Sequence, residues 1–222
     1  MLDGWNEFAA PIWLSIQVAL AASIFVMIAA TAAAARMARA RFRGRSVVET
    51  VLLLPLVLPP TVIGFLLLLL LGRRSWIGQA YEWLIGQPIV FSWIAAVLAA
   101  AVVAFPLAYR TIKTGFEEVD ADLEASARAY GASEWQVFRW ITAPLASRSL
   151  LTGYLLGFAR GLGEFGATLM IAGNIPHRTQ TLPTAIYIAV ESGNMKLAWA
   201  WAGVTVLISF AMLLIVNRRS KP

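Results

Sequence analysis

The sequence has no cysteine and a single histidine, His177, among its 222 residues. The lack of cysteine excludes disulfide bonds, thiolate nucleophiles and cysteine-ligated metal sites, and one histidine cannot form a histidine-cluster metal site. Charge is also scarce, because only 14% of the residues are charged while 59% are hydrophobic. The mean hydropathy is +0.72. A soluble domain of this length rarely carries so little charge, so the composition predicts a membrane protein.

Five apolar stretches are long enough to cross a membrane as helices, which takes roughly 20 residues each. The predicted spans are residues 12–35, 47–71, 90–109, 150–172 and 197–216. The first is too long for the core of a signal peptide and its basic residues follow it, so we expect a retained span. The sequence therefore predicts an all-α, polytopic membrane protein with about five transmembrane helices, in which residues 1–222 form a single transmembrane domain.

The basic residues predict how these spans are oriented. Most of the 18 Lys and Arg residues lie in three segments on one side of the spans: residues 36–45, residues 110–148 and the C-terminal tail. Basic loops stay in the cytoplasm, so we expect the N-terminus outside and the C-terminus inside. The net charge of +6 is then mainly a topology signal. We expect contacts with membrane lipid and no nucleic-acid partner.

The cytoplasmic loop at residues 110–148 carries the signals of two short helices. Asp120 is a suitable N-cap for the first helix, and Gly131 suits the left-handed position that ends a helix. An S-x-x-Q capping box at Ser133 starts the second helix, which we expect Pro144 to stop. The two helices, from Asp120 to Pro144, are called the cytoplasmic elbow below.

Three functions are candidates for the cytoplasmic elbow. An interfacial amphipathic connector would explain Val137, Trp140 and Ile141, which helical spacing places on one face of the second helix. A helix-turn-helix DNA reader is excluded because the charged residues of segment 117–134 are six acids and one base, Arg128, and such a surface repels phosphate. The third function is docking of another protein.

The cytoplasmic elbow resembles the EAA motif of bacterial ABC importer permeases, whose pattern is E-A-A, three residues, G, nine residues and I-x-L-P. Ser126 takes the place of the second alanine and Ala143 that of the leucine. In that family the elbow is the coupling helix that sits in a cleft of the ATPase subunit. The resemblance therefore implies that the ATPase-coupling residues are Glu124, Ala125, Ser126, Gly131, Ala132, Ser133, Ile141 and Pro144.

The sequence lacks the G-x-x-x-x-G-K-[ST] loop that cradles the phosphates of ATP. We therefore expect a transport subunit and not an enzyme, without catalytic residues and without a bound cofactor or metal. ATP and Mg²⁺ are expected on a partner ATPase.

The second predicted span contains LPLVLPPTVIGF, which places Pro55, Pro59, Pro60 and Gly64 along one helix. Each proline removes a backbone hydrogen bond, and in lipid the freed carbonyls need other partners. Such a helix is tolerated where protein shields it or where it lines a cavity. A packing kink and a gate in the translocation path both fit, with Pro59, Pro60 and Thr61 as the gate candidates.

The fourth predicted span carries two patterns. Arg160 and Glu164 lie one helical turn apart, and ionisable residues inside a membrane usually face protein or water. They can pair with each other, in a structural or a gating role. Because Glu164 would repel an anion, Arg160, Thr168 and Thr61 are the better candidates to face one. Small residues at four-residue spacing allow a second helix to pack closely, and here they are Gly153, Gly157 and Gly161.

The segment between the fourth and fifth spans is expected outside the cell. Its apolar part, residues 182–190, is too short to span and is predicted to form a re-entrant or lid helix. Arg178 and the pair Arg73 and Arg74 are either a receiving surface for an acidic partner or ordinary solvated side chains.

Further stretches are similar to the permease subunit of molybdate ABC transporters: LPLVLPPTVIGF, LLGRRSWIG, ARGLGEFGATLMIAGNIP and RTQTLPTAIY. The resemblance implies a type I ABC importer permease in the inner membrane, working as a homodimer. It also implies two copies of a cytoplasmic ATPase and an extracytoplasmic oxyanion-binding protein. The implied substrate is molybdate or tungstate, moved by alternating access. Sulfate and thiosulfate permeases share much of the pattern and are the nearest alternative.

Two other classes of membrane protein predict different sequence features. A secondary transporter driven by an ion gradient would need inverted repeats and acidic ion sites at the membrane midplane, whereas the only acids within the predicted spans are Glu164 and Glu49, and Glu49 lies at the end of its span. A membrane scaffold for a cytoplasmic enzyme would explain the elbow, but neither the proline-broken span nor the charged pair.

Overall fold

The computed structural model describes the backbone of residues 2–220 and the side chains of residues 5–215. Within these residues the chain is helical and contains no strand, so the all-α prediction is confirmed. The helices are α1 (Leu2–Ala38), α2 (Arg45–Val57), α3 (Pro60–Leu71), α4 (Trp76–Ile85), α5 (Trp93–Glu117), α6 (Ala121–Ala129), α7 (Glu134–Val137), the π-helical turn η1 (Phe138–Thr142), α8 (Ala143–Leu145), α9 (Ser147–Leu162), α10 (Gly166–Ala172), α11 (Leu182–Glu191) and α12 (Met195–Ser220).

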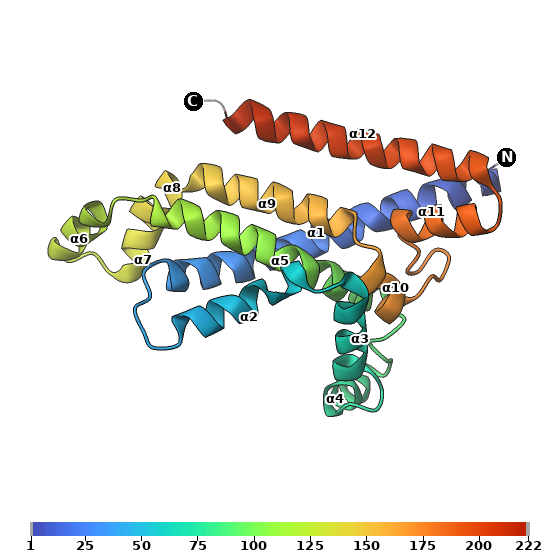
Figure 1. Cartoon of the computed structure of the whole chain (residues 1–222), viewed down its shortest axis with the longest axis horizontal. Helices are drawn as coiled ribbons and strands as arrows, with labels where there is room; N and C mark the ends of the chain where they lie inside the picture. Colours follow the sequence, from blue (N-terminus) through green and yellow to red (C-terminus); the bar gives the residue numbers. More distant parts are fainter. Residues whose placement is uncertain (1, 221–222) are drawn as a thin grey trace.

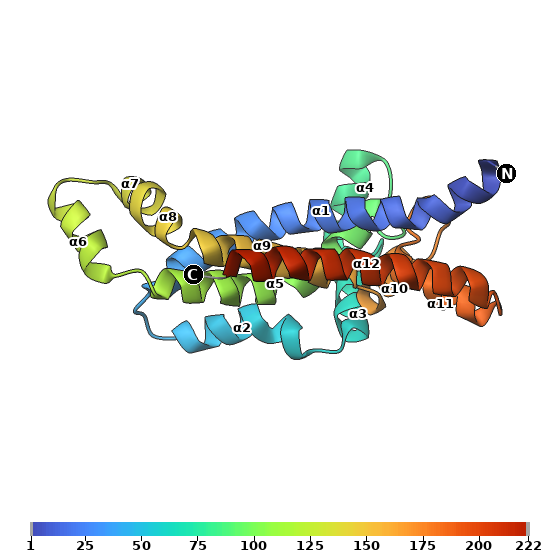
Figure 2. The same cartoon turned by 90° about the horizontal axis from the view of Figure 1, so that it is seen from above.

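The core is formed by α1, α5 and α9, which lie side by side along the long axis of the molecule (Figure 1, Figure 2). Helix α5 is central, and it buries a row of alanines together with Tyr109, Ile112 and Phe116. The start of α1 and α11 lie at one end of the bundle, whereas α6, α7 and the end of α12 lie at the other. The first and last described helices therefore begin and end at opposite ends of the bundle, as the predicted topology requires.

Three helices are long and apolar enough to cross a membrane: Trp5–Ala38, Trp93–Glu117 and Met195–Ile215. Two bent pairs of helices account for the other two predicted spans, which gives up to five. The third predicted span begins at Trp93 and not at residue 90, because the Ser92 hydroxyl caps the helix by accepting from the amide of Ala95. The prediction of about five spans is confirmed, two of them as broken ones.

The second predicted span is not one helix. Helices α2 and α3 are bent by 113° relative to each other. Leu58 and Pro59 between them are extended, because a residue that precedes proline avoids the α-helical region. Pro60 then occupies the start of α3, where its missing N–H is tolerated. Pro55, Pro59 and Gly64 thus lie in α2, at the break and in α3, so the predicted proline-broken span is present as two helices and not as one kinked helix.

The fourth predicted span is bent by 60° between α9 and α10. Its three glycines occupy the face of α9 that packs on α5. A Cβ on Gly153 would lie 2.7 Å from Cγ1 of Ile112, and one on Gly157 would lie 3.4 Å from Cβ of Ala108. Gly161 faces Ala100 of α5, and a Cβ added there would lie at a similar distance from the Ala100 side chain. The predicted packing stripe is therefore present.

Besides the elbow helices, two short helices of the described residues lie outside the five spans. Helix α11 corresponds to the predicted lid helix, and the Ser15 hydroxyl of α1 accepts a hydrogen bond from the amide of Leu182 at its start. Helix α4 was not predicted. Its signals are nevertheless in the sequence, because Ser75 accepts from the amide of Gly78 as an N-cap and Gly86 is left-handed at the C-terminus.

Helix α3 is held to α10 through Gly64, and we expect Gly64→Ala to destabilise the protein. An added Cβ would lie 2.6 Å from Cβ of Met170 and 2.9 Å from Cα of Ala167, so the helices must separate. Overpacking of this kind costs about 1–3 kcal/mol. The matched control is Gly203→Ala in α12, where nothing lies within 4 Å and the melting temperature should stay level or rise. Equal melting temperatures of the two variants in detergent would contradict the packing.

Candidate coupling site and translocation path

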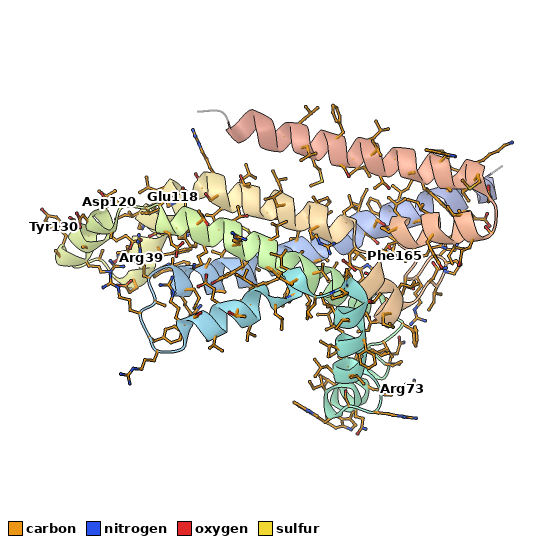
Figure 3. The ribbon with its side chains drawn as sticks, in the orientation of Figure 1. Arg39, Arg73, Glu118, Asp120, Tyr130 and Phe165 are labelled. Atoms are coloured by element: carbon orange, nitrogen blue, oxygen red, sulfur yellow. The ribbon has the colours of Figure 1, made fainter. Side chains whose placement is uncertain are left out.

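The cytoplasmic elbow projects beyond the ends of α1 and α5, with Asp120 where it begins and Tyr130 at its far end (Figure 3). The Asp120 carboxylate accepts from the amide of Asp122 and starts α6. Gly131 has φ of +87°, the left-handed conformation that glycine adopts without strain. Ser133 caps α7 within a complete capping box with Gln136. These predictions of the elbow's local structure are confirmed.

The predicted end of the second elbow helix was wrong. The helical path passes through Pro144 and ends at Ala146, after which α9 begins. A π-helical turn precedes the proline, and the amide of Ala143 bonds to the carbonyl of Phe138, five residues earlier. A wider turn of this kind accommodates a proline whose missing N–H would interrupt an α-helix.

The same π turn changes which residues of the second elbow helix are buried. Val137 is buried and so is Thr142, five residues later, whereas Trp140 is 70% exposed. The predicted apolar face of Val137, Trp140 and Ile141 assumed α-helical spacing, and it was wrong for this reason. Trp140 faces outward with the Arg139 guanidinium 5.3 Å from its ring centre, so this side of the elbow is an exposed aromatic and basic surface.

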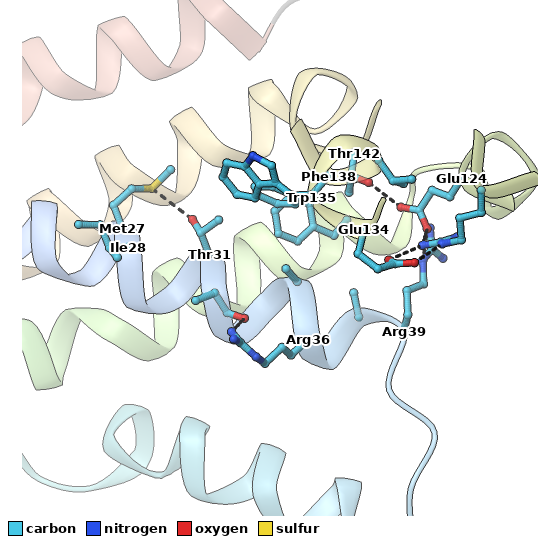
Figure 4. A pocket seen from close by; sticks show the side chains of 16 residues that line it. Met27, Ile28, Thr31, Arg36, Arg39, Glu124, Glu134, Trp135, Phe138 and Thr142 are labelled. Carbon is cyan, nitrogen blue, oxygen red and sulfur yellow. Dashed lines mark hydrogen bonds and ion pairs between the residues drawn. The ribbon is translucent and has the colours of Figure 1, made fainter. Parts of the chain in front are cut away.

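Glu124 lies inside the elbow and not on its surface. The side chain is 4% exposed and accepts a 2.7 Å hydrogen bond from the Thr142 hydroxyl (Figure 4). Its second carboxylate oxygen lies 3.3 Å from Nε of Arg39 at the end of α1 and 3.6 Å from Arg128. Glu124 thus joins α6, η1 and α1, so the elbow is fixed to the bundle at this point.

The spacing of the elbow departs from the family pattern by one residue, in agreement with the buried position of Glu124. Four residues separate Ser126 from Gly131, one more than the family pattern allows. The triplet at the family spacing is therefore Ala125, Ser126 and Ala127, and Glu124 precedes it. The predicted coupling residues exposed at the surface are Ala125, Ser126, Gly131, Ser133 and Pro144, with Ala132 and Ile141 half-buried.

A second ion pair joins the two elbow helices. Nε of Arg128 donates a 2.7 Å hydrogen bond to Glu134, and this hydrogen bond lowers the pKa of the Glu134 carboxyl. Because the folded-state pKa is depressed, the pair stabilises the elbow above the ordinary pKa of glutamate. That contribution is lost as the pH falls through the lowered pKa. The pair is exposed, so its effect is small near neutral pH.

We expect Glu124→Ala to loosen the elbow without unfolding the bundle. The change leaves the Thr142 hydroxyl and the Arg39 guanidinium without their acceptor, a loss of about 1–3 kcal/mol confined to the elbow. Amide hydrogen exchange in residues 121–142 should rise while that of α5 is unchanged. The control is Glu118→Ala, an exposed acid nearby that is in no ion pair of the described residues. Unchanged exchange in Glu124→Ala would contradict the anchoring role.

The charged pair of the fourth span lies at the break between α9 and α10. Arg160 donates a 3.0 Å hydrogen bond to Glu164, and the other carboxylate oxygen of Glu164 accepts from the amide of Ala167. Glu164 is 2% exposed, whereas the Arg160 side chain keeps 33% of its surface. The predicted pair is therefore present, and Glu164 also accepts a hydrogen bond from the first turn of α10.

The breaks in the two bent spans meet beside this pair. A Cβ on Gly166 would lie 3.1 Å from Cβ of Pro60 and 3.4 Å from Cγ2 of Thr61. Pro59 and Thr61 are exposed at this point. Thr168 is 1% exposed in this structure, and that it faces an anion stays a prediction. The structure thus brings Pro60, Thr61 and the Arg160–Glu164 pair into one region.

One ion-pair cluster was not anticipated from the sequence. Nζ of Lys113 in α5 lies 2.6 Å from Glu49 in α2 and 3.1 Å from Glu117, which also pairs with Arg45. The signal available was the i, i+4 spacing of Lys113 and Glu117, but Glu49 is 64 residues away in the chain. The cluster ties α2 to α5 near the cytoplasmic end of the bundle.

The outward-facing cations differ in their partners. Arg73 pairs with Glu82 of α4 at 3.0 Å, whereas Arg74 and Arg178 are exposed. Within residues 2–220 no group of three or more acidic or histidine side chains is placed to hold a metal ion.

The structure is a polytopic helical bundle in which two broken spans surround a buried charge pair, and a rigid elbow lies at one end. This is the architecture of a membrane transport permease. The chain belongs to the family described as the binding-protein-dependent transport system inner membrane component, whose model matches residues 25–219.

Relatives of known name agree with this assignment. The chain is 56% identical to YvgM of Bacillus subtilis (strain 168), named for a molybdenum transport system, over 96% of this chain and 94% of the relative. It is 43% identical to the molybdenum transport system permease protein ModB of Escherichia coli (strain K12), over 93% of this chain and 94% of ModB.

A solved structure shows the fold. A bacterial ABC transporter that imports the acidic polysaccharide alginate matches with a TM-score of 0.76 and 14% identity, over 98% of this chain and 81% of that one. The fold is therefore that of a type I ABC importer permease.

Proposed function

We propose that this chain is the permease subunit of an ATP-driven importer that moves molybdate or tungstate across the inner membrane by alternating access. The observation that carries the ATP-coupled part is the elbow, which projects from the bundle and is anchored to it through Glu124. The substrate rests on the identity to molybdenum transport permeases over nearly the whole chain. A sulfate or thiosulfate permease is the alternative that the test below separates.

The elbow is suited to transmit a displacement. The functional assembly is a homodimer of this chain with two cytoplasmic ATPase subunits. When the ATPase subunits close on ATP, each elbow moves with its ATPase. Because Glu124 bonds to Thr142 and pairs with Arg39, that movement is passed to α1 as well as to α9, which follows the elbow directly. A flexible connector would absorb the same movement.

The path for the anion passes the region where the two broken spans meet. The Arg160 side chain keeps a third of its surface exposed, and it supplies positive charge where an oxyanion crosses. Glu164 orients Arg160 from the buried side, so the carboxylate itself stays away from the anion. An extracytoplasmic binding protein delivers the oxyanion to the outer end of this path.

The chain binds no cofactor in this scheme. ATP and Mg²⁺ are held by the ATPase subunits, and substrate crosses without a covalent intermediate. The chain itself contributes a path, a gate and a docking elbow.

Competition during uptake tests the substrate. Cells that express this chain with its ATPase and binding protein, in a strain without its own molybdate uptake, should accumulate molybdate at submicromolar supply. Excess tungstate should suppress accumulation, and the same excess of sulfate should not. If sulfate alone suppresses accumulation, the substrate belongs to the sulfate class and is not molybdate. The assignment of the chain as an ATP-driven permease would then still hold.

A further inference from the structure

A groove of about 710 Å³ lies between the C-terminal third of α1 and the cytoplasmic elbow (Figure 4). It is separate from the region where the broken spans meet. Trp135 stacks on Phe138 at 5.8 Å along the elbow wall, and Phe116 supports Phe138 edge-on from α5. The wall on the α1 side includes Met27, Ile28, Thr31, Ala32 and Ala35.

The lining of the groove changes from apolar to charged along α1. Residues from Met27 to Ala35 contribute hydrocarbon and one hydroxyl, whereas Arg36 and Arg39 follow at the cytoplasmic end. A helix rises 1.5 Å per residue, so Met27 lies roughly 14 Å from Arg36 along the axis. One leaflet of a bilayer is about 15 Å of hydrocarbon. The apolar part of the groove therefore has the depth of one leaflet, and Arg36 lies at the level of its headgroups.

Arg36 is the cation of the groove that has no acidic partner among the described residues. Its guanidinium donates to the carbonyl of Ala32 in its own helix, and the side chain is exposed. Arg39 and Arg128, in contrast, are engaged by Glu124 and Glu134. A negatively charged group at the mouth of the groove would meet Arg36 without displacing an existing ion pair.

We propose that the groove binds one anionic phospholipid of the cytoplasmic leaflet. An acyl chain lies along Met27, Ile28 and Ala32, and the phosphate is held by Arg36. A cytoplasmic ATPase does not reach the depth of Met27, so the apolar half requires an occupant from the membrane. Because its walls belong to α1 and to the elbow, the bound lipid joins the spanning bundle to the docking element.

Native mass spectrometry of the full chain, purified in detergent in its own assembly, tests the site. With equal amounts of phosphatidylglycerol and phosphatidylcholine added, the protein should retain the anionic lipid preferentially. Arg36→Gln should reduce that preference by about tenfold, the change expected for one charged contact. The matched control is Arg148→Gln, an exposed arginine of α9 outside the groove, which should retain the preference.

A second pair of variants tests the apolar half. Ala32→Trp fills the groove and should reduce retention of both lipids, whereas Ala211→Trp on the exposed surface of α12 should not. Equal retention of the two lipids by the unchanged protein, or an unchanged preference in Arg36→Gln, would overturn the proposal. A disulfide between two copies of the Ala32→Cys variant would also overturn the proposal. The chain has no other cysteine, so such a bond would show that a second copy covers the groove. None of these measurements depends on transport.

Discussion

Gly131→Trp should abolish ATP-dependent uptake while the spanning bundle stays folded. Gly131 has φ of +87°, so any larger residue is strained there by about 1–2 kcal/mol. Nothing lies within 4 Å of an added Cβ, so the indole would project into the space that we propose the ATPase cleft to occupy. Uptake is expected to fall at least a hundredfold, measured in proteoliposomes together with binding of the ATPase to the purified permease.

The control for Gly131→Trp is Gly86→Trp. Gly86 also has positive φ, also has nothing within 4 Å of an added Cβ, and lies at the end of α4, away from the elbow. It carries the same side chain and a similar strain, so it should retain uptake if the elbow is the docking site. Gly131→Asn should be intermediate, since asparagine tolerates the left-handed region. Normal uptake and ATPase binding by Gly131→Trp would show that the elbow does not enter a cleft.

Glu164→Ala should destabilise the permease and stop transport. The change removes the partner of Arg160 and the acceptor for the amide of Ala167 at the same time. Breaking a buried pair costs about 3–5 kcal/mol, and the lower end applies here because Arg160 keeps a third of its surface exposed. The melting temperature in detergent should fall clearly below that of the unchanged protein.

Glu164→Gln separates the two roles of this residue. The amide oxygen can still accept from Ala167, so α10 should keep its first turn and much of its stability. The negative charge that orients Arg160 is lost, so uptake should fall although the protein folds. If Glu164→Gln transports normally, the pair is structural only. If Glu164→Ala melts like the unchanged protein, the buried pair has no stabilising role.

The local structure of the elbow could be predicted because its signals are local. Asp120, Ser133 and Gly131 each act within three residues of their position in the chain, so capping rules suffice. The π turn could not be predicted, because it depends on how a proline is accommodated within a packed helix. One extra residue in that turn moved Trp140 to the surface and Thr142 to the interior.

Long-range contacts account for the other differences. The resemblance to the EAA motif placed Glu124 among the coupling residues, and its burial could not be foreseen because its partners are Thr142, 18 residues away, and Arg39, directly after α1. The prolines of the second span predicted a break without its direction, because the 113° angle is set by packing of α3 on α10. In contrast, the charged pair of Arg160 and Glu164 lies one turn apart and was predictable from spacing alone.

The central claim is that ATP drives oxyanion import through this chain, and uptake in proteoliposomes tests it most directly. The permease and its ATPase are reconstituted with the binding protein outside, and accumulation of molybdate is followed with ATP inside or with an imposed proton gradient. Accumulation with ATP, and none with the proton gradient or without the ATPase, is the predicted result. Accumulation driven by the proton gradient alone would contradict the account and indicate a secondary transporter.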